Sequence, residues 1–133
     1  MASIFSKIVQ GEIPCYKIAE TEDYLAFLDI NPLAEGHTLC IPKKEVDYIF
    51  DLDEKTYIGL QLFSRHVAKA IHAVVDCKRI GTAVIGLEVP HAHLHLVPIN
   101  DIGDLNFSKE KLKFTPEEFK DTAARIRAQI PGQ

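Results

Sequence analysis

The apolar residues between positions 54 and 75 predict one long helix in the middle of the chain. They recur at intervals of three or four, the period of one helix face: Leu60, Phe63, Val67, Ile71 and Val74. Asp53 precedes this run and can cap the helix. The other candidate elements are short, with three strands before the helix and two after it. Strands that come in groups favour an antiparallel sheet, so we expect an α+β fold of about five strands.

Apolar alternation and turn residues give approximate bounds for the other elements. The expected strands span residues 15–21, 24–29, 38–42, 77–86 and 91–99. A short helix is expected within residues 3–11, where Ser3 can cap and Gly11 can end it. A C-terminal helix is expected within residues 115–130, because Thr115, Pro116 and Glu118 form a capping box with proline in the first turn. We expect residues 1–133 to form a single domain.

Composition and charge restrict the partners of this protein. The net charge is −4 and the pI is about 5.8, so no basic field attracts a nucleic-acid backbone. No run approaches the apolar length that a membrane span requires. The three cysteines, Cys15, Cys40 and Cys77, are odd in number and widely spaced, which argues against a disulfide framework. We therefore expect a cytoplasmic protein that binds neither nucleic acid nor membrane.

Three of the six histidines alternate within the stretch PHAHLHLVP, at His91, His93 and His95. Successive side chains of a strand point to opposite faces, so the three imidazoles are expected to share one face of a strand. The residues between them are apolar and are expected to pack on the core.

Three interpretations of this histidine cluster are open from the residues alone. The histidines could merely occupy an exposed strand face, although partial protonation would make neighbouring imidazoles repel. They could bind a metal ion, since imidazole is the commonest metal ligand. They could also catalyse a reaction at phosphorus, with one neutral imidazole as the nucleophile and a second as a hydrogen-bond donor.

Together with two upstream segments, the histidine cluster resembles the histidine triad (HIT) family. HAHLHLVP fits the pattern His-φ-His-φ-His-φ-φ, where φ is apolar. SIFSKIVQGEIP and LAFLDINPLAEGHTLCIPKK are similar to the N-terminal and central segments of that family. These matches cover most of residues 3–98, and they resemble the nucleoside phosphoramidase-like, or Hint-type, branch most closely.

The resemblance implies a hydrolase or transferase that acts at the α-phosphate of a purine nucleotide of the AMP or GMP type. His93 is then the nucleophile, and a nucleotidyl-His93 intermediate is released by water. His95 contacts phosphate oxygens and assists the leaving group, and His91 shapes the hydrogen bonds of the nucleophile. His37, in GHTLCIP, is expected to support the tautomer of His93. The alternatives are a dinucleoside polyphosphate hydrolase and a nucleotide-binding regulatory protein with little turnover.

The same resemblance implies the nucleotide-binding residues. Asp29 matches the carboxylate that binds the ribose hydroxyls, and a carboxylate can accept a hydrogen bond from each of two vicinal hydroxyls. Gly86, Glu88 and Val89 precede the triad, where the family contacts phosphate and leaving group. Apolar residues match the positions that hold the purine base: Ile4, Phe5, Ile8, Phe27 and Ile30.

The chain departs from the family pattern at two places. Ser3 and Ser6 stand where many members have cysteines that bind structural zinc, and serine is a poor zinc ligand. We therefore expect no metal and no cofactor. Leu87 and Glu88 replace a glutamine and a small polar residue, and a carboxylate near the leaving group would favour an amine over a phosphate. A homodimer is expected by resemblance only.

Overall fold

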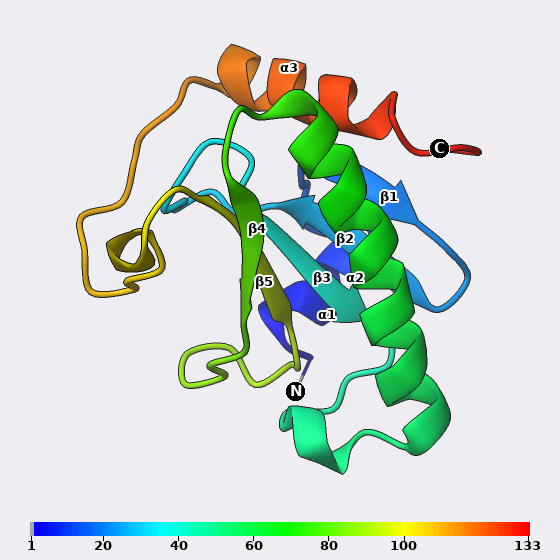
Figure 1. The fold of residues 1–133 in the computed structure, drawn as a ribbon. Coiled ribbons are helices and arrows are strands. Elements are labelled where there is room, and N and C mark those ends of the chain that lie inside the picture. The colour runs from blue at the N-terminus through cyan, green and yellow to red at the C-terminus, as the bar shows by residue number, and fades with distance from the viewer. Residues whose placement is uncertain (1) are drawn as a thin grey trace.

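The computed structural model describes residues 2–133 and contains a five-stranded antiparallel sheet with strand order β1-β2-β3-β5-β4 (Figure 1). The expected α+β fold is confirmed. The strands are β1 Lys17–Glu20, β2 Tyr24–Leu28, β3 Thr38–Pro42, β4 Arg79–Ala83 and β5 Leu94–Ile99.

The helices begin at the capping residues that the sequence predicts. Helix α1 spans Ile4–Val9, and the side chain of its N-cap Ser3 accepts a hydrogen bond from the amide of Ser6. Helix α2 spans Glu54–Val74 after its N-cap Asp53. Helix α3 spans Pro116–Arg127 and has the predicted capping box. None of the helices within residues 2–133 has the length and apolar character needed to cross a bilayer.

The two faces of the sheet bury different sets of side chains, and this division positions the site. Helix α2 lies across one face (Figure 1), where Ala26, Cys40 and Leu94 join the main core. Helix α1 covers part of the other face, where Phe5 packs with Phe27. Because strand residues alternate between faces, His95 lies on the α1 face and its neighbours Leu94 and Leu96 pack in the main core.

Strand β5 is shorter than expected and begins only at Leu94, so the predicted strand 91–99 is wrong over its first three residues. The amide of His91 donates to the carbonyl of Val89 at 2.8 Å, and the amide of Ala92 donates to the carbonyl of Val46 at 2.7 Å. These bonds hold the segment in an irregular conformation in place of strand pairing. Strand β4 is likewise shorter than its predicted range. Short 3-10 helices at Ile49–Asp51 and Ile102–Asp104 were not expected.

Candidate active site

A cavity of about 420 Å³ opens on the α1 face of the sheet, a volume within the usual range of small-molecule sites. Its wall includes every predicted site residue except His91: Ile4, Phe5, Ile8, Phe27, Asp29, Ile30, His37, Gly86, Glu88, Val89, His93 and His95. The segments that supply them are α1, the end of β2, the start of β3, the β4–β5 loop and the start of β5. The structure thus brings together residues that lie more than 80 positions apart in the sequence.

The ring of His93 is held in one tautomer by the main chain. Its Nδ1 lies 2.8 Å from the carbonyl oxygen of His91, and a carbonyl can only accept, so Nδ1 carries the proton. In the neutral ring the lone pair is then on the other nitrogen, Nε2. His93 is 7% exposed and lines the cavity, and the ring of Phe5 packs edge-on against it at 5.0 Å between centroids. A neutral imidazole with an unprotonated Nε2 can act as a nucleophile.

A chain of hydrogen bonds fixes the tautomers of His37 and His95. The amide of Leu33 donates to Nδ1 of His37 at 2.9 Å, so the proton of His37 is on Nε2. That Nε2 lies 2.9 Å from Nδ1 of His95, which must accept, so His95 presents an Nε2–H donor. The expectation that His37 supports His93 is therefore corrected. His37 orients His95 through their hydrogen bond. The orientation of His93 is set by the carbonyl of His91 and does not involve His37.

Burial keeps both of these imidazoles neutral. Burial lowers the pKa of His37 to about 4, with the positive charge of Lys111 adding to the effect. Burial lowers the pKa of His95 to about 3, and the neighbouring His37 and His93 add to this effect. Near neutral pH the pair thus acts as hydrogen-bond donors and acceptors without net charge.

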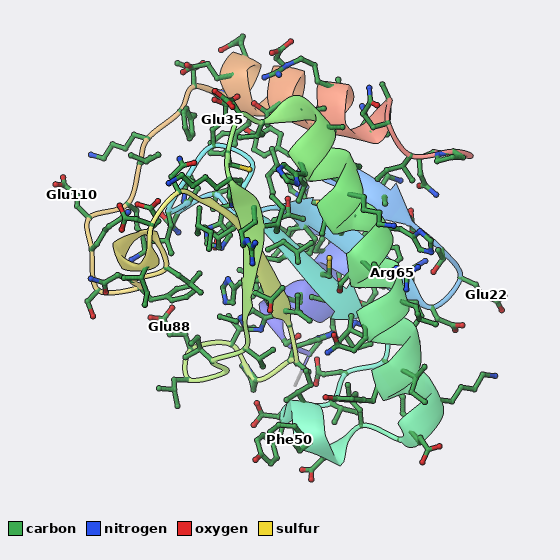
Figure 2. All side chains as sticks on the ribbon, viewed as in Figure 1. Glu22, Glu35, Phe50, Arg65, Glu88 and Glu110 are labelled. Carbon is green, nitrogen blue, oxygen red and sulfur yellow. The ribbon has the colours of Figure 1, made fainter. Side chains whose placement is uncertain are left out.

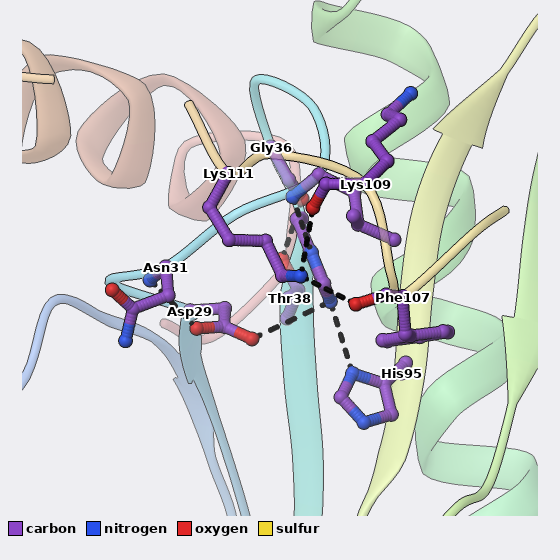
Figure 3. Close-up of polar contacts among 10 residues, drawn as sticks. Asp29, Asn31, Gly36, Thr38, His95, Phe107, Lys109 and Lys111 are labelled. Carbon is purple, nitrogen blue, oxygen red and sulfur yellow. Dashed lines mark hydrogen bonds and ion pairs between the residues drawn. The ribbon is translucent and has the colours of Figure 1, made fainter. Parts of the chain in front are cut away.

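Asp29 follows strand β2 and faces the same pair. Its Oδ1 accepts a hydrogen bond from the amide of Asn31 at 2.8 Å, and its Oδ2 lies 3.6 Å from Nε2 of His37 (Figure 3). Burial raises the pKa of Asp29, while the amide of Asn31, His93 and Lys111 oppose that rise. Since His37 is neutral near pH 7, the contact is not an ion pair, and Oδ2 remains free to accept hydrogen bonds from a ligand.

His91 lies outside the cavity and is 0% exposed. Its Nε2–H donates to the carbonyl of Pro42 at 2.8 Å, and its Nδ1 accepts from the hydroxyl of Ser3 at 2.9 Å. Glu45 accepts from the amide of Ser3 and from the hydroxyl of Ser6, both at 2.6 Å. This cluster ties helix α1 to the residue whose carbonyl holds His93. Two hydroxyls and one carboxylate beside a single imidazole do not fit structural zinc, which takes thiolate and imidazole ligands.

A second candidate metal site consists of Asp29, His37 and His95, whose ligand atoms lie within 4.8 Å of one another. The hydrogen-bond chain through Leu33 places a proton on Nε2 of His37, between the two histidines. That nitrogen is a donor and offers no lone pair to an ion. The arrangement therefore suits hydrogen bonding that orients His95 better than it suits metal coordination.

Several residues of the cavity wall were not predicted. Phe107 and Lys111 come from the segment between β5 and α3, and the ring of Phe107 packs edge-on against His95 at 4.7 Å between centroids. The sequence around them, DLNFSKEKLKF, shows no motif or periodicity that could have identified them. The wall also includes Ile13, Pro14, Cys15, Leu28, Asn31, Leu39, Ile85 and Leu87.

The loop between β4 and β5 forms the outer wall of the cavity, and Figure 2 labels Glu88 on it. Gly86 has a φ of +74°, in the left-handed region that favours glycine, which explains a glycine there. Leu87 is 88% exposed. The loop thus presents both departures from the family pattern, Leu87 and Glu88, at the mouth of the cavity.

The sheet, the cavity and the histidines define a histidine triad site, and comparison with known proteins agrees. The HIT domain pattern matches residues 10–102. The adenosine 5′-monophosphoramidase of Schizosaccharomyces pombe is 35% identical over 136 residues, covering 98% of this chain and 99% of the yeast protein. The adenosine 5′-monophosphoramidase of Saccharomyces cerevisiae is 37% identical over 101 residues, covering 75% of this chain and 64% of that protein. The chain belongs to the HIT domain family, in agreement with the Hint-type resemblance of its sequence.

Solved structures show the same fold. A HIT-like protein from Bartonella henselae superposes with a TM-score of 0.83 at 29% identity, covering 96% of each chain. A zinc-bound histidine triad protein from Mycobacterium smegmatis superposes with a TM-score of 0.82 at 29% identity, covering 97% of this chain and 93% of that one.

The buried histidines predict that acid destabilises the fold. In the unfolded chain a histidine has its ordinary pKa of 6.5 and binds a proton below that pH. In the folded protein His37 binds a proton only near pH 4 and His95 only near pH 3, so the unfolded state binds more protons between these values. The free energy of unfolding should therefore fall as the pH decreases from 6.5 towards 4, by about 3 kcal/mol from His37 alone. Urea unfolding at several pH values measures this slope.

The matched variants are His37→Gln and His66→Gln, since His66 is exposed on helix α2. His37→Gln should reduce the slope between pH 6.5 and 4 because the contribution of His37 is lost while that of His95 remains, and His66→Gln should leave the slope unchanged. A stability that is constant across this range, or an equal slope in both variants, would contradict the assignment.

Proposed function

We propose that this protein is a nucleotide hydrolase or transferase that acts on purine nucleoside 5′-phosphoramidates through a nucleotidyl-His93 intermediate. The observation that carries the proposal is the hydrogen bond from Nδ1 of His93 to the carbonyl of His91, which in the neutral ring places the lone pair on Nε2, at the cavity. The yeast relatives that are named adenosine 5′-monophosphoramidases support the substrate class.

In the first step Nε2 of His93 attacks the α-phosphorus, and the phosphorus–nitrogen bond breaks. The leaving nitrogen takes up a proton from solvent and departs as an amine. The Nε2–H of His95 donates a hydrogen bond to a phosphoryl oxygen or to the leaving nitrogen, where charge develops. Water then attacks the phosphorus, which releases the nucleoside monophosphate and restores His93.

The rest of the cavity fits the remainder of a nucleotide. Asp29 can accept hydrogen bonds from the ribose hydroxyls through its free Oδ2. Ile4, Phe5 and Ile8 of helix α1 and Phe27 of strand β2 give an apolar wall for a flat base. A ligand atom of Asp29 lies within 4.8 Å of a ring nitrogen of His95, so a ribose bound to Asp29 puts the attached phosphate close to His95.

The structure favours an amine over a polyphosphate as the leaving group. Glu88 lines the cavity, and its negative charge acts on Asp29 across it. A second carboxylate repels an anionic leaving group and attracts a cationic one. Dinucleoside polyphosphate hydrolysis therefore stays the second candidate.

Replacement of the nucleophile is the first test of this function. His93→Ala should lower kcat for an adenosine phosphoramidate by about a thousandfold or more, because it removes the attacking nitrogen. Its Kd for AMP should stay within a few-fold of wild type, as measured by calorimetry. Turnover that persists in this variant would contradict the mechanism.

Glu88→Gln tests the choice of leaving group. The variant should lose phosphoramidate activity relative to diadenosine polyphosphate activity by roughly fivefold, the upper end of the scale for one exposed charge contact. Glu22→Gln, on the turn between β1 and β2, is the control and should leave both rates unchanged. Equal effects of Glu88→Gln on the two substrates would refute a role in selecting the leaving group.

A homodimer is also part of the proposal, and strand β4 offers the edge for it. The opposite edge, β1, is partly covered, since Gln133 exchanges side-chain hydrogen bonds with the main chain of Glu20, and Arg127 donates to the carbonyl of Lys17. Strand β4 is the other edge of the sheet. Light scattering should give twice the chain mass of 14.9 kDa, and a monomer at micromolar concentration would contradict this expectation.

A further inference from the structure

The segment between β5 and α3 completes the cavity with residues beyond the HIT match. That match ends at residue 102, whereas Phe107 and Lys111 both line the cavity. Phe107 packs on His95 and Lys111 carries a positive charge, so part of the site comes from outside the range that the family pattern matches.

The ammonium of Lys111 is held in place by the segment itself. Its Nζ donates to the carbonyl of Phe107 at 2.6 Å and to the carbonyl of Lys109 at 3.0 Å (Figure 3). An ammonium has three N–H donors, so one remains for a further acceptor. Because the side chain is already fixed, a ligand that takes this third donor loses little additional entropy in ordering it.

The charge of Lys111 lies at the Asp29 end of the cavity. It lowers the pKa of Asp29 and of His37, whereas the lowered pKa of His95 results from burial, His37 and His93. Yet the ion pairs within residues 2–133 include none between Lys111 and Asp29. Both residues line the cavity, and their charged groups are too far apart for a direct ion pair, so a ligand in the cavity can contact both.

We infer that Lys111 is a specificity-determining residue that binds the ribose together with Asp29. This inference rests on the proposed nucleotide site. A ribose hydroxyl is both a donor and an acceptor. It donates to Oδ2 of Asp29 and accepts the third N–H of Lys111. A nucleotide that lacks both hydroxyls cannot bridge the two residues, so Lys111 makes the site selective for ribose over dideoxyribose.

The test compares three ligands by calorimetry: AMP, adenosine and 2′,3′-dideoxyadenosine monophosphate. Lys111→Met should weaken binding of AMP and of adenosine by about tenfold, the scale of a hydrogen bond to a charged group, and change binding of the dideoxy ligand less than twofold. Lys113→Met, an exposed lysine on the same segment, is the control and should change none of them.

Other patterns overturn the inference in recognisable ways. A loss with AMP and the dideoxy ligand but not with adenosine would assign Lys111 to the phosphate. An equal loss with all three would assign it to holding the segment through Phe107 and Lys109.

If the wild type hydrolyses phosphoramidates but Lys111→Met binds all ligands normally, only this inference fails. If the wild type binds AMP and Lys111→Met loses the ribose preference without any turnover in either, only the proposed function fails. If the wild type binds no AMP, both fail.

Discussion

The hydrogen bond between Nδ1 of His93 and the carbonyl of His91 is the interaction on which the site depends. It selects one of two tautomers of a neutral imidazole, and only that tautomer leaves Nε2 free at the cavity. A strand-paired carbonyl would already be engaged with a neighbouring strand. Strand β5 begins only at Leu94, so the carbonyl of His91 lies in the irregular segment before it and accepts from the imidazole of His93.

Much of the surrounding structure keeps this segment in place. The imidazole of His91 is fixed between the carbonyl of Pro42 and the hydroxyl of Ser3, and Ser3 is also the N-cap of helix α1. Glu45 joins the same cluster through Ser3 and Ser6. The N-terminal helix therefore contributes Phe5 to the cavity wall and also orients the backbone that holds His93. Hydrogen bonds among the buried Ser3, Ser6 and His91 and the exposed Glu45 hold this arrangement together.

The sequence predicted those features that depend on local patterns. The caps of the three helices and the bounds of β3 follow from a few neighbouring residues, and the structure confirms them. The resemblance to the HIT family anticipated most of the cavity wall. The contact between His37 and His95 was not predictable, because it depends on the pairing of β3 with β5, which places Leu39 opposite His95. Phe107 and Lys111 lie on an irregular segment that no local pattern positions.

The central claim is that fixed tautomers make His93 a nucleophile and His95 a donor. Nitrogen NMR of the ¹⁵N-labelled ligand-free protein at neutral pH tests it directly, with each imidazole assigned from single histidine-to-glutamine variants. The account predicts that His93 carries its proton on Nδ1 and that His95 carries its proton on Nε2. A proton on Nε2 of His93, or a positively charged His95, would contradict it.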